Sequence, residues 1–344
     1  MPEDRTTAFG RQFLQRNTWI RAQSLRDQAS AEREAVAIYR DMGARVRAAI
    51  DRLSPSDLEN RQRLLGLRRR VESLLRDAAA DLEKATRKAW RTGARDSINQ
   101  TQRFLARIPG LQAINFGAVT QDEENDIVRQ TVQWLNDPIT QGVAFSDRVW
   151  QANRNVTANV MRQVQFGAID GLGTAEIGRQ VNQYLADPEG TARQAGTIQG
   201  LRTRARAARE EGDAARAARL FASAKEREMQ LPPATPGVYR SPAKNAERLV
   251  RTEFAKASQR SIEEYGTGRT WAKGVSWNLS GSHPEPDVCD PYVGIYRIGE
   301  LPEVPHPNCL CYWVLVPDPQ LTGGAPIVYK TGPTGAKAKL PLTA

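Results

Sequence analysis

Apolar residues in the first hundred positions recur at alternating spacings of three and four, and this spacing constrains the fold more than any other feature. It is typical of helices packed along a coiled-coil-type seam. The seam residues are Val36, Tyr39, Val46, Ile50 and Leu53, then Leu64, Leu67, Val71, Leu74, Ala78, Leu82, Ala85 and Ala89. Between the two series, Ser54-Pro55-Ser56 combines a helix end with a new N-cap. We therefore predict a helical hairpin over residues 1–110.

Shorter helical patterns fill a middle region, residues 111–237. The candidate helices span 121–136, 146–168 and 174–186, with Ser146 and Thr174 as the expected N-caps. Residues 197–229 are rich in Ala and Arg and contain few large apolar side chains, so we expect a solvated helical excursion there. The proline-rich stretch 231–237 reads as a linker that closes the region.

The character of the chain changes in the last third. An apolar helical pattern over 243–265 is followed by strand-like alternation at 275–279 and a short apolar run at 311–316. We predict a small α+β domain over 238–317 and an extended or disordered tail over 318–344. The fold class predicted for the whole chain is mainly α.

The charge of the chain is strongly positive. The formal net charge is +10, and residues 1–110 hold 23 basic against 14 acidic residues. Such an excess fits a protein that lies beside a polyanion, or simply helices with solvated faces. Neither a secretory signal nor an apolar run near the ~18 residues of a membrane-spanning helix is present, so we expect a soluble protein in a reducing compartment.

Every histidine and cysteine falls within one window of 29 residues. Thiolates and imidazoles are the preferred donors for tetrahedral zinc, so the clustering suggests a structural zinc site. The proposed ligands are Cys289, His306, Cys309 and Cys311, with His283, Asp287 or Asp290 as substitutes. Two alternatives stay open. The cysteines can be small core residues with His306 capping a turn, or they can form a disulfide, which a reducing environment opposes.

An enzymatic interpretation has little support in the sequence. His283-Pro-Glu285 with a later cysteine pair is similar to the zinc deaminase pattern, but Cys309 and Cys311 are one residue closer than that pattern requires. The metalloprotease, phosphate-loop and nucleophile-elbow motifs are absent from the sequence. We therefore expect that the chain is not an enzyme.

Residues 244–313 resemble the phage Mu F-like minor head protein family, also called the phage head morphogenesis domain. The residues that carry this resemblance are the helix Arg248-Leu-Val-Arg251-Thr252-Glu253-Phe254-Ala255, then Trp277, Asp287-Val-Cys289-Asp290, Gly294, Tyr296 and Pro305-His306-Pro307-Asn308-Cys309-Leu310-Cys311. Many family members have Cys-x2-Cys where this chain has Cys289-Asp-Pro-Tyr292, and Arg where it has Leu310. The helices from 146 to 186 are similar to the less regular upstream region of the family, whereas the hairpin is not accounted for.

The resemblance implies a low-copy structural protein at the portal vertex inside the head of a tailed bacteriophage. It would act in head assembly, DNA packaging or DNA ejection, with the portal protein, other head proteins and packaged double-stranded DNA as partners. Its location would be the virion, and the host cytoplasm during assembly, with no membrane association. The alternative is a DNA-binding protein with a zinc-type C-terminal domain, and the salt dependence of DNA binding separates the two.

Two structural expectations follow for the helices. The helix that carries Arg251 and Glu253 should dock on the C-terminal domain, with at least one of these charges paired in the tertiary structure. A hairpin alone gains little stability, because helices depend mainly on tertiary packing. We therefore expect its seam to bind the portal protein or other copies of the chain. On this hypothesis, Val71→Asp or Leu74→Asp abolishes incorporation into heads and leaves soluble expression largely intact.

Overall fold

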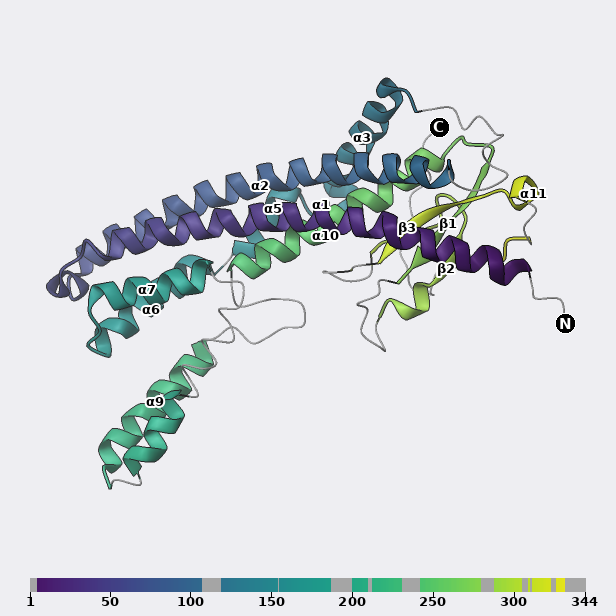
Figure 1. Cartoon of the computed structure of the whole chain (residues 1–344). Helices are drawn as coiled ribbons and strands as arrows, with labels where there is room; N and C mark the ends of the chain where they lie inside the picture. The colour runs from purple at the N-terminus through teal and green to yellow at the C-terminus, as the bar shows by residue number, and fades with distance from the viewer. Residues whose placement is uncertain are drawn as a thin grey trace. The chain divides into compact units, whose positions relative to one another are not determined.

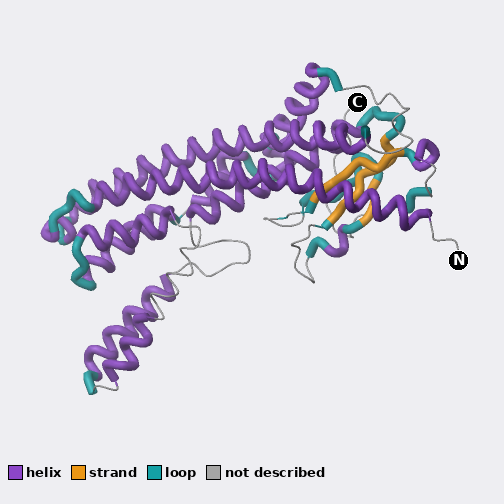
Figure 2. The backbone as a smooth tube through the Cα atoms, in the orientation of Figure 1, coloured by secondary structure: helices purple, strands orange, loops and turns teal. Residues whose placement is uncertain are grey.

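The computed structural model describes residues 5–106, 119–153, 155–186, 200–209, 212–230, 242–279, 288–304, 309, 311–322 and 326–331. The described chain is mainly helical and has a small three-stranded antiparallel sheet near its C-terminal end, as predicted (Figures 1 and 2). No helix in these ranges combines the length and the apolar character needed to cross a membrane.

The chain divides into two compact units, each made of separate stretches of sequence. We call residues 33–83 and 148–248 the hairpin unit, and residues 1–32, 84–147 and 249–344 the sheet unit. The domain boundaries expected near 110 and 237 lie outside the described residues. Linear boundaries therefore do not describe how the chain is partitioned, because each unit is assembled from distant segments.

The predicted helical hairpin is present. Helix α1 spans Arg5–Ile50 and helix α2 spans Arg61–Leu105, joined by a turn with the 3-10 helix η1, Pro55–Leu58. The Ser54 side chain accepts a hydrogen bond from the backbone N–H of Asp57, and the Asp57 carboxylate accepts one from the backbone N–H of Ser54. These two reciprocal bonds form a capping box at the N-terminal end of η1. The two helices lie side by side in the hairpin unit, where Arg45 pairs with Asp77 at 3.9 Å (Figure 1).

The seam residues are buried as their spacing predicts. Tyr39, Val46, Ile50, Val71 and Leu82 are all fully buried, whereas Leu53 and Leu64 beside the turn are half-buried. The chain itself buries this seam. Contrary to the expectation, the seam is therefore not open to the portal protein or to another copy of the chain. We therefore correct the expectation for Val71→Asp, because a carboxylate at this position is expected to unfold the hairpin unit rather than to block docking alone.

The predicted helix over 146–168 is two helices, α5 (Phe145–Asn153) and α6 (Val156–Ile169). Asn153 at the end of α5 accepts a hydrogen bond from the buried Tyr39 hydroxyl, a long-range contact that local spacing does not reveal. Ser146 lies inside α5 rather than before it. The predicted helix over 174–186 is present as α7, Thr174–Ala186, although Thr174 is its first residue and not its N-cap.

Glycines let the helices of the hairpin unit approach closely. A Cβ atom on Gly167 of α6 would lie 2.4 Å from Cγ1 of Ile177 on α7. A Cβ on Gly43 of α1 would lie 2.6 Å from Oδ1 of Asn182, also on α7. Helix α7 therefore packs on α1 and supplies the third surface that the hairpin alone lacks.

The Ala- and Arg-rich segment forms two short helices in the hairpin unit. Residues 200–209 are helical, and helix α9 spans Ala214–Gln230. We call these two helices the helical pair. Their contact is formed by Leu201, Ala224 and Leu220, which is a small apolar core. The solvated helical excursion predicted over 197–229 matches this arrangement where the residues are described.

The sheet unit combines helices with the small sheet. Its elements are α3 (Gln121–Asn136), α4 (Pro138–Gln141), α10 (Pro242–Gly266, from Leu249 on), β1 (Ala272–Asn278), η2 (Asp290–Tyr292), β2 (Gly294–Tyr296), β3 (Tyr312–Pro317) and α11 (Pro319–Thr322). The strand order is β2-β1-β3, and both neighbours pair antiparallel to β1. Trp277 on β1 lies opposite Trp313 on β3.

Helix α10 docks on the long helices through paired polar groups. The Arg251 guanidinium donates two hydrogen bonds to the Glu32 carboxylate on α1, at 2.7 and 2.8 Å. Trp90 on α2 donates from Nε1 to the buried Glu253 carboxylate at 3.2 Å. The expectation that a charge of this helix has a tertiary partner is therefore confirmed for both residues.

Part of the segment expected to be an extended or disordered tail packs on the domain. Helix α11 directly follows β3, and Tyr329 forms a parallel bridge with Ile295 of β2. The Tyr329 hydroxyl also donates to the backbone carbonyl of Lys273 at 2.9 Å. The tail prediction therefore needs correction for residues 318–322 and 326–331, which extend the folded domain beyond 317.

We predict opposite effects on stability for two glycine substitutions in the hairpin unit. Gly167→Ala should lower the free energy of unfolding by about 1–3 kcal/mol, because the new methyl group overlaps the buried Ile177 side chain. Gly66→Ala on the exposed face of α2 meets no neighbouring atom within 4 Å and should raise it by about 0.5–1 kcal/mol. Urea unfolding of both variants measures the difference. Equal stability of the two would contradict the close packing of α6 on α7.

Candidate metal centre

The structure brings all three cysteines together in the core of the sheet unit. Cys289 directly precedes η2, and Cys309 and Cys311 precede β3. Their exposed fractions are 0%, 1% and 2%. Two segments that lie 20 residues apart in the sequence therefore place three thiols in one buried cluster.

Strand pairing fixes this arrangement. The β1–β3 ladder places Trp277 against Trp313 with their ring centroids 5.3 Å apart, edge to face. The ring of Tyr292, at the end of η2, lies 5.2 Å from Trp277. The backbone N–H of Tyr292 donates to the Cys289 carbonyl at 2.9 Å and closes the turn that carries this cysteine. The aromatic side chains thus hold the Cys289 turn and the start of β3 against the same strand.

The spacing of the sulfur atoms suits a tetrahedral metal ion. The three Sγ atoms lie within 4.8 Å of one another, and those of Cys289 and Cys309 are 3.6 Å apart. Two thiolates at about 2.3 Å from a tetrahedral zinc ion are separated by roughly 3.8 Å. A disulfide requires an S–S distance of about 2.05 Å, and all three cysteines are free in this structure. The donor set therefore fits a metal ion, and it also fits packing of three neutral thiols.

The cluster strongly favours protonated thiols when no cation is bound. Hydrogen bonds with the Cys309 and Cys311 thiols, followed by burial, raise the pKa of Cys289 far above its usual range. For Cys309, the hydrogen bond with Cys289 lowers the pKa, but the hydrogen bond with Cys311 and burial outweigh it and raise the pKa to about 12. Binding of a metal ion would therefore have to displace the protons of these thiols.

A small cavity of about 30 Å³, lined by both polar and apolar side chains, borders Cys309 and Cys311. Its wall includes Gln28 on α1, Gln100 on α2 and Trp313 on β3. Nε2 of both glutamines and Nε1 of Trp313 are buried and have no hydrogen-bond partner among the described residues. Thiolates bound to a divalent cation carry excess negative charge that N–H donors stabilise. Donors on this wall that reach Cys309 or Cys311 would therefore favour the thiolate form of the cluster.

The remaining predicted ligands are not placed beside the cysteines by this structure. His283, Asp287 and His306 lie outside the described residues, as does Glu285 of the deaminase-like pattern. Asp290 is described and half-buried, but it does not belong to the cysteine group. The metal ligands that the structure supports are therefore the three cysteines.

Sequence analysis did not identify the polar residues of the cavity. Gln100 continues the seam spacing of α2 after Ala89, through Gly93 and Asp96, so a polar residue at an apolar position was a usable signal. No comparable signal marks Gln28 or Trp313. Both become recognisable only when α1 and β3 meet in the folded sheet unit.

Two carboxylates lie between α1 and α2 in the same unit. Burial and the charge of Asp27, to which it is hydrogen-bonded, raise the pKa of Asp96 to about 7. Arg103 lowers this pKa and Glu124 raises it, each by a smaller amount. Asp96 therefore binds a proton more tightly in the folded chain than in the unfolded chain, where its pKa is near 3.8.

We predict that Asp96→Asn stabilises the chain at neutral pH. Because the folded-state pKa is raised, the wild type should lose stability as the pH rises from about 4 to about 7, where Asp96 ionises in the folded chain. The asparagine variant should lack this part of the pH dependence. Urea unfolding at several pH values measures it, with Asp81→Asn on the exposed face of α2 as the control. A variant with the pH profile of the wild type would show that Asp96 does not titrate in this way.

Comparisons of the chain with protein-family models, curated proteins and solved structures give no match. The resemblance of residues 244–313 therefore rests on the motif residues themselves.

Proposed function

We propose that this chain is a minor head protein of a tailed bacteriophage, associated with the portal vertex and acting in head assembly, DNA packaging or DNA ejection. The proposal gives it a structural rather than an enzymatic role. It rests on the family resemblance of residues 244–313 and on the structural role that the resembling residues have in this chain.

The supporting observation is that the motif residues converge on one core. Six of them, spread over about sixty positions of sequence, are at most 2% exposed. These residues are Glu253, Trp277, Cys289, Tyr296, Cys309 and Cys311. Buried residues of this kind specify a packed domain, whereas an active site needs groups that a substrate can reach.

Gly294 of the motif also has a structural role. Its φ of +151° is a conformation that side chains with a Cβ rarely adopt, and a Cβ there would lie 2.9 Å from Cδ of Lys330. Lys330 in turn donates from Nζ to the carbonyl of Val293 at 2.9 Å. The glycine therefore lets the segment after α11 lie against β2.

We further propose that Cys289, Cys309, Cys311 and His306 hold a structural zinc ion. The sulfur spacing and the unpaired N–H donors of Gln28, Gln100 and Trp313 support the three cysteines as zinc ligands. His306 is included because every histidine and cysteine of the chain falls within one short window of the sequence. A zinc ion bound there would cross-link the Cys289 turn to the start of β3. It would supply folding energy and not catalysis.

The expected partners are the portal protein, other head proteins and packaged double-stranded DNA. Because the chain buries its own hairpin seam, docking would involve exposed faces of the helices. The net charge of +10 supports a position beside DNA, since a basic surface lowers the free energy of lying near a polyanion. Self-association through exposed helical faces is compatible with the same role.

We predict that the full-length protein produced with zinc contains about one equivalent of metal and loses thermal stability when a chelator removes it. His306→Ala should weaken zinc binding, and His283→Ala, a change of the same residue type in the same window, should not. Elemental analysis and a competition titration with a chromophoric chelator measure both. Metal-free protein would favour packing of neutral thiols, and Cys309→Ser would then cost only about 1–3 kcal/mol.

We also predict that the chain is a low-copy component of purified phage heads. Quantitative mass spectrometry of purified particles should detect it at far fewer copies than the major capsid protein. Imaging of the same particles, without imposed icosahedral symmetry, should place it at the portal vertex. Purified heads that lack the chain would contradict the proposed function.

A further inference from the structure

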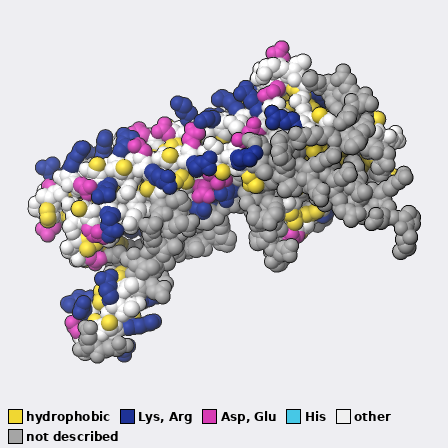
Figure 3. Space-filling model, in the orientation of Figure 1, with side chains coloured by type: hydrophobic (Ala, Val, Ile, Leu, Met, Phe, Trp, Pro, Cys, Tyr) yellow, Lys and Arg dark blue, Asp and Glu magenta, His cyan; other side chains and the backbone are white. Residues whose placement is uncertain are grey.

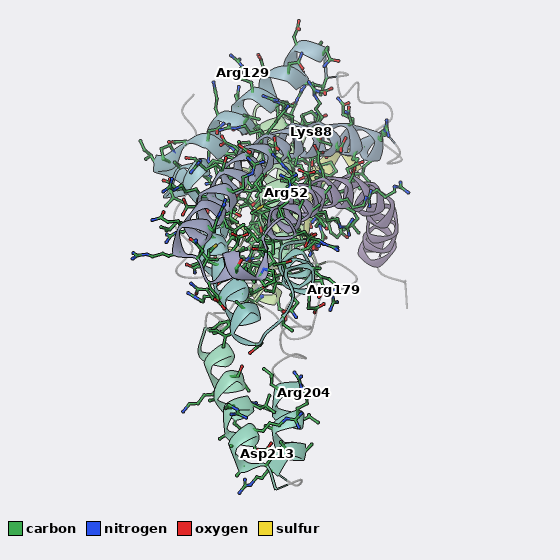
Figure 4. The ribbon with its side chains drawn as sticks, turned by 90° about the vertical axis from the view of Figure 1, so that its left-hand side faces the viewer. Arg52, Lys88, Arg129, Arg179, Arg204 and Asp213 are labelled. Carbon is green, nitrogen blue, oxygen red and sulfur yellow. The ribbon has the colours of Figure 1, made fainter. Side chains whose placement is uncertain are left out.

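The helical pair presents a concentration of exposed positive charge. Within residues 200–209 and 212–225 the only acidic side chain is Asp213, and it is a turn residue that accepts a hydrogen bond from the backbone of Arg216 at 2.9 Å. Figure 3 shows the basic side chains on the surface of this segment, and Figure 4 labels Arg204 and Asp213. The exposed basic residues are Arg202, Arg204, Arg206, Arg209, Arg216, Arg219 and Lys225.

The basic residues of the hairpin have a different environment. Arg45 lies near Asp41 and Asp77, and Arg68 donates to the Glu72 carboxylate at 2.9 Å. Over residues 33–83 as a whole, 11 basic side chains face 9 acidic ones, so the charges of this stretch nearly balance. The excess charge in the described part of the hairpin unit is therefore concentrated on the helical pair.

The spacing of these arginines places them in rows. The buried residues Leu201, Ala205 and Ala208 follow spacings of four and three, and Arg202, Arg206 and Arg209 repeat the same spacings one position later. The arginines thus form a stripe beside the buried face. A helix rises 1.5 Å per residue, so neighbouring members of the stripe are separated by about 4.5–6 Å along the axis.

The lack of an apolar surface argues against a membrane as the ligand. Among the described side chains of the helical pair, Phe221 is the only large apolar residue that is exposed, at 37%. A helix that lies in a membrane interface needs a whole apolar face. Guanidinium groups instead match phosphate oxygens in geometry and charge. The surface therefore fits a water-exposed phosphate backbone.

We propose that the helical pair, in its described residues 200–209 and 212–225, is a sequence-independent binding site for the phosphate backbone of duplex DNA. This inference rests on the proposed function only in naming packaged DNA as the polyanion. The arginines bind phosphates in place of the counterions that surround free DNA. Binding at this site is therefore driven by counterion release and weakens steeply with salt.

The test compares two full-length variants with the same change in charge. One replaces Arg202, Arg206, Arg209 and Arg219 by Gln, and the control replaces the exposed Arg61, Arg69, Arg70 and Arg76 of α2 by Gln. Fluorescence anisotropy with a labelled DNA duplex gives the affinity between 50 and 200 mM salt. If all four arginines of the pair contact phosphates, the slope of log K against log salt should fall by about 3.6 in magnitude. The control should keep the slope of the wild type.

Several results would overturn the inference. They are a wild-type protein that does not bind the duplex, a control variant that loses as much affinity as the pair variant, and poly-glutamate that competes as well as DNA at equal charge. Circular dichroism must show equal helix content in both variants.

The outcome of this test is separable from the proposed function. A chain found in purified heads whose pair variant binds DNA normally refutes only this inference, and a pair variant that loses DNA binding in a chain absent from heads refutes only the proposed function.

Discussion

The fold of the sheet unit depends on pairing the polar groups that α1 and α2 bury against α10. Glu32 lies four residues before Val36, at the next seam position of α1, and Trp90 of α2 carries a buried indole N–H. If the two helices simply continued as a coiled coil, these groups would be buried without partners, at a cost of several kcal/mol for the carboxylate. The Arg251 guanidinium satisfies Glu32, and Glu253 satisfies the indole N–H of Trp90. The long helices therefore select α10 as their neighbour.

Sequence periodicity predicted the helices well, because local spacing determines which face of a helix is apolar. The ends of α3 and α7 and the break at Ser54 followed from this spacing and from turn chemistry. The division between α5 and α6 did not, and the hydrogen bond that Asn153 accepts there from Tyr39 spans 114 positions of sequence, beyond the reach of local spacing. The clustering of the cysteines was likewise visible in composition, while the donors Gln28 and Gln100 were not, since they come from the opposite end of the chain.

The cysteine cluster shows how the same packing can serve two chemical states. With protons on the thiols, Cys289 and Cys309 are small buried groups in the same core as Trp277 and Trp313. With a cation in place of the protons, the same three sulfur atoms would become ligands at nearly unchanged spacing. The indole and amide N–H groups beside the cavity are unused in the first state and useful in the second. This asymmetry is the structural argument for metal binding.

The helical pair has a further consequence through its small core. Apart from Leu201 and Leu220, its contact surface consists of alanine, and alanine contributes little hydrophobic stabilisation. The hairpin seam instead buries leucine, valine, isoleucine and tyrosine side chains along its length. Local opening of the pair therefore requires much less free energy than opening of the hairpin, so its amide hydrogens should exchange with solvent first. The pair can thus unfold and refold as a small cooperative unit while the hairpin stays intact.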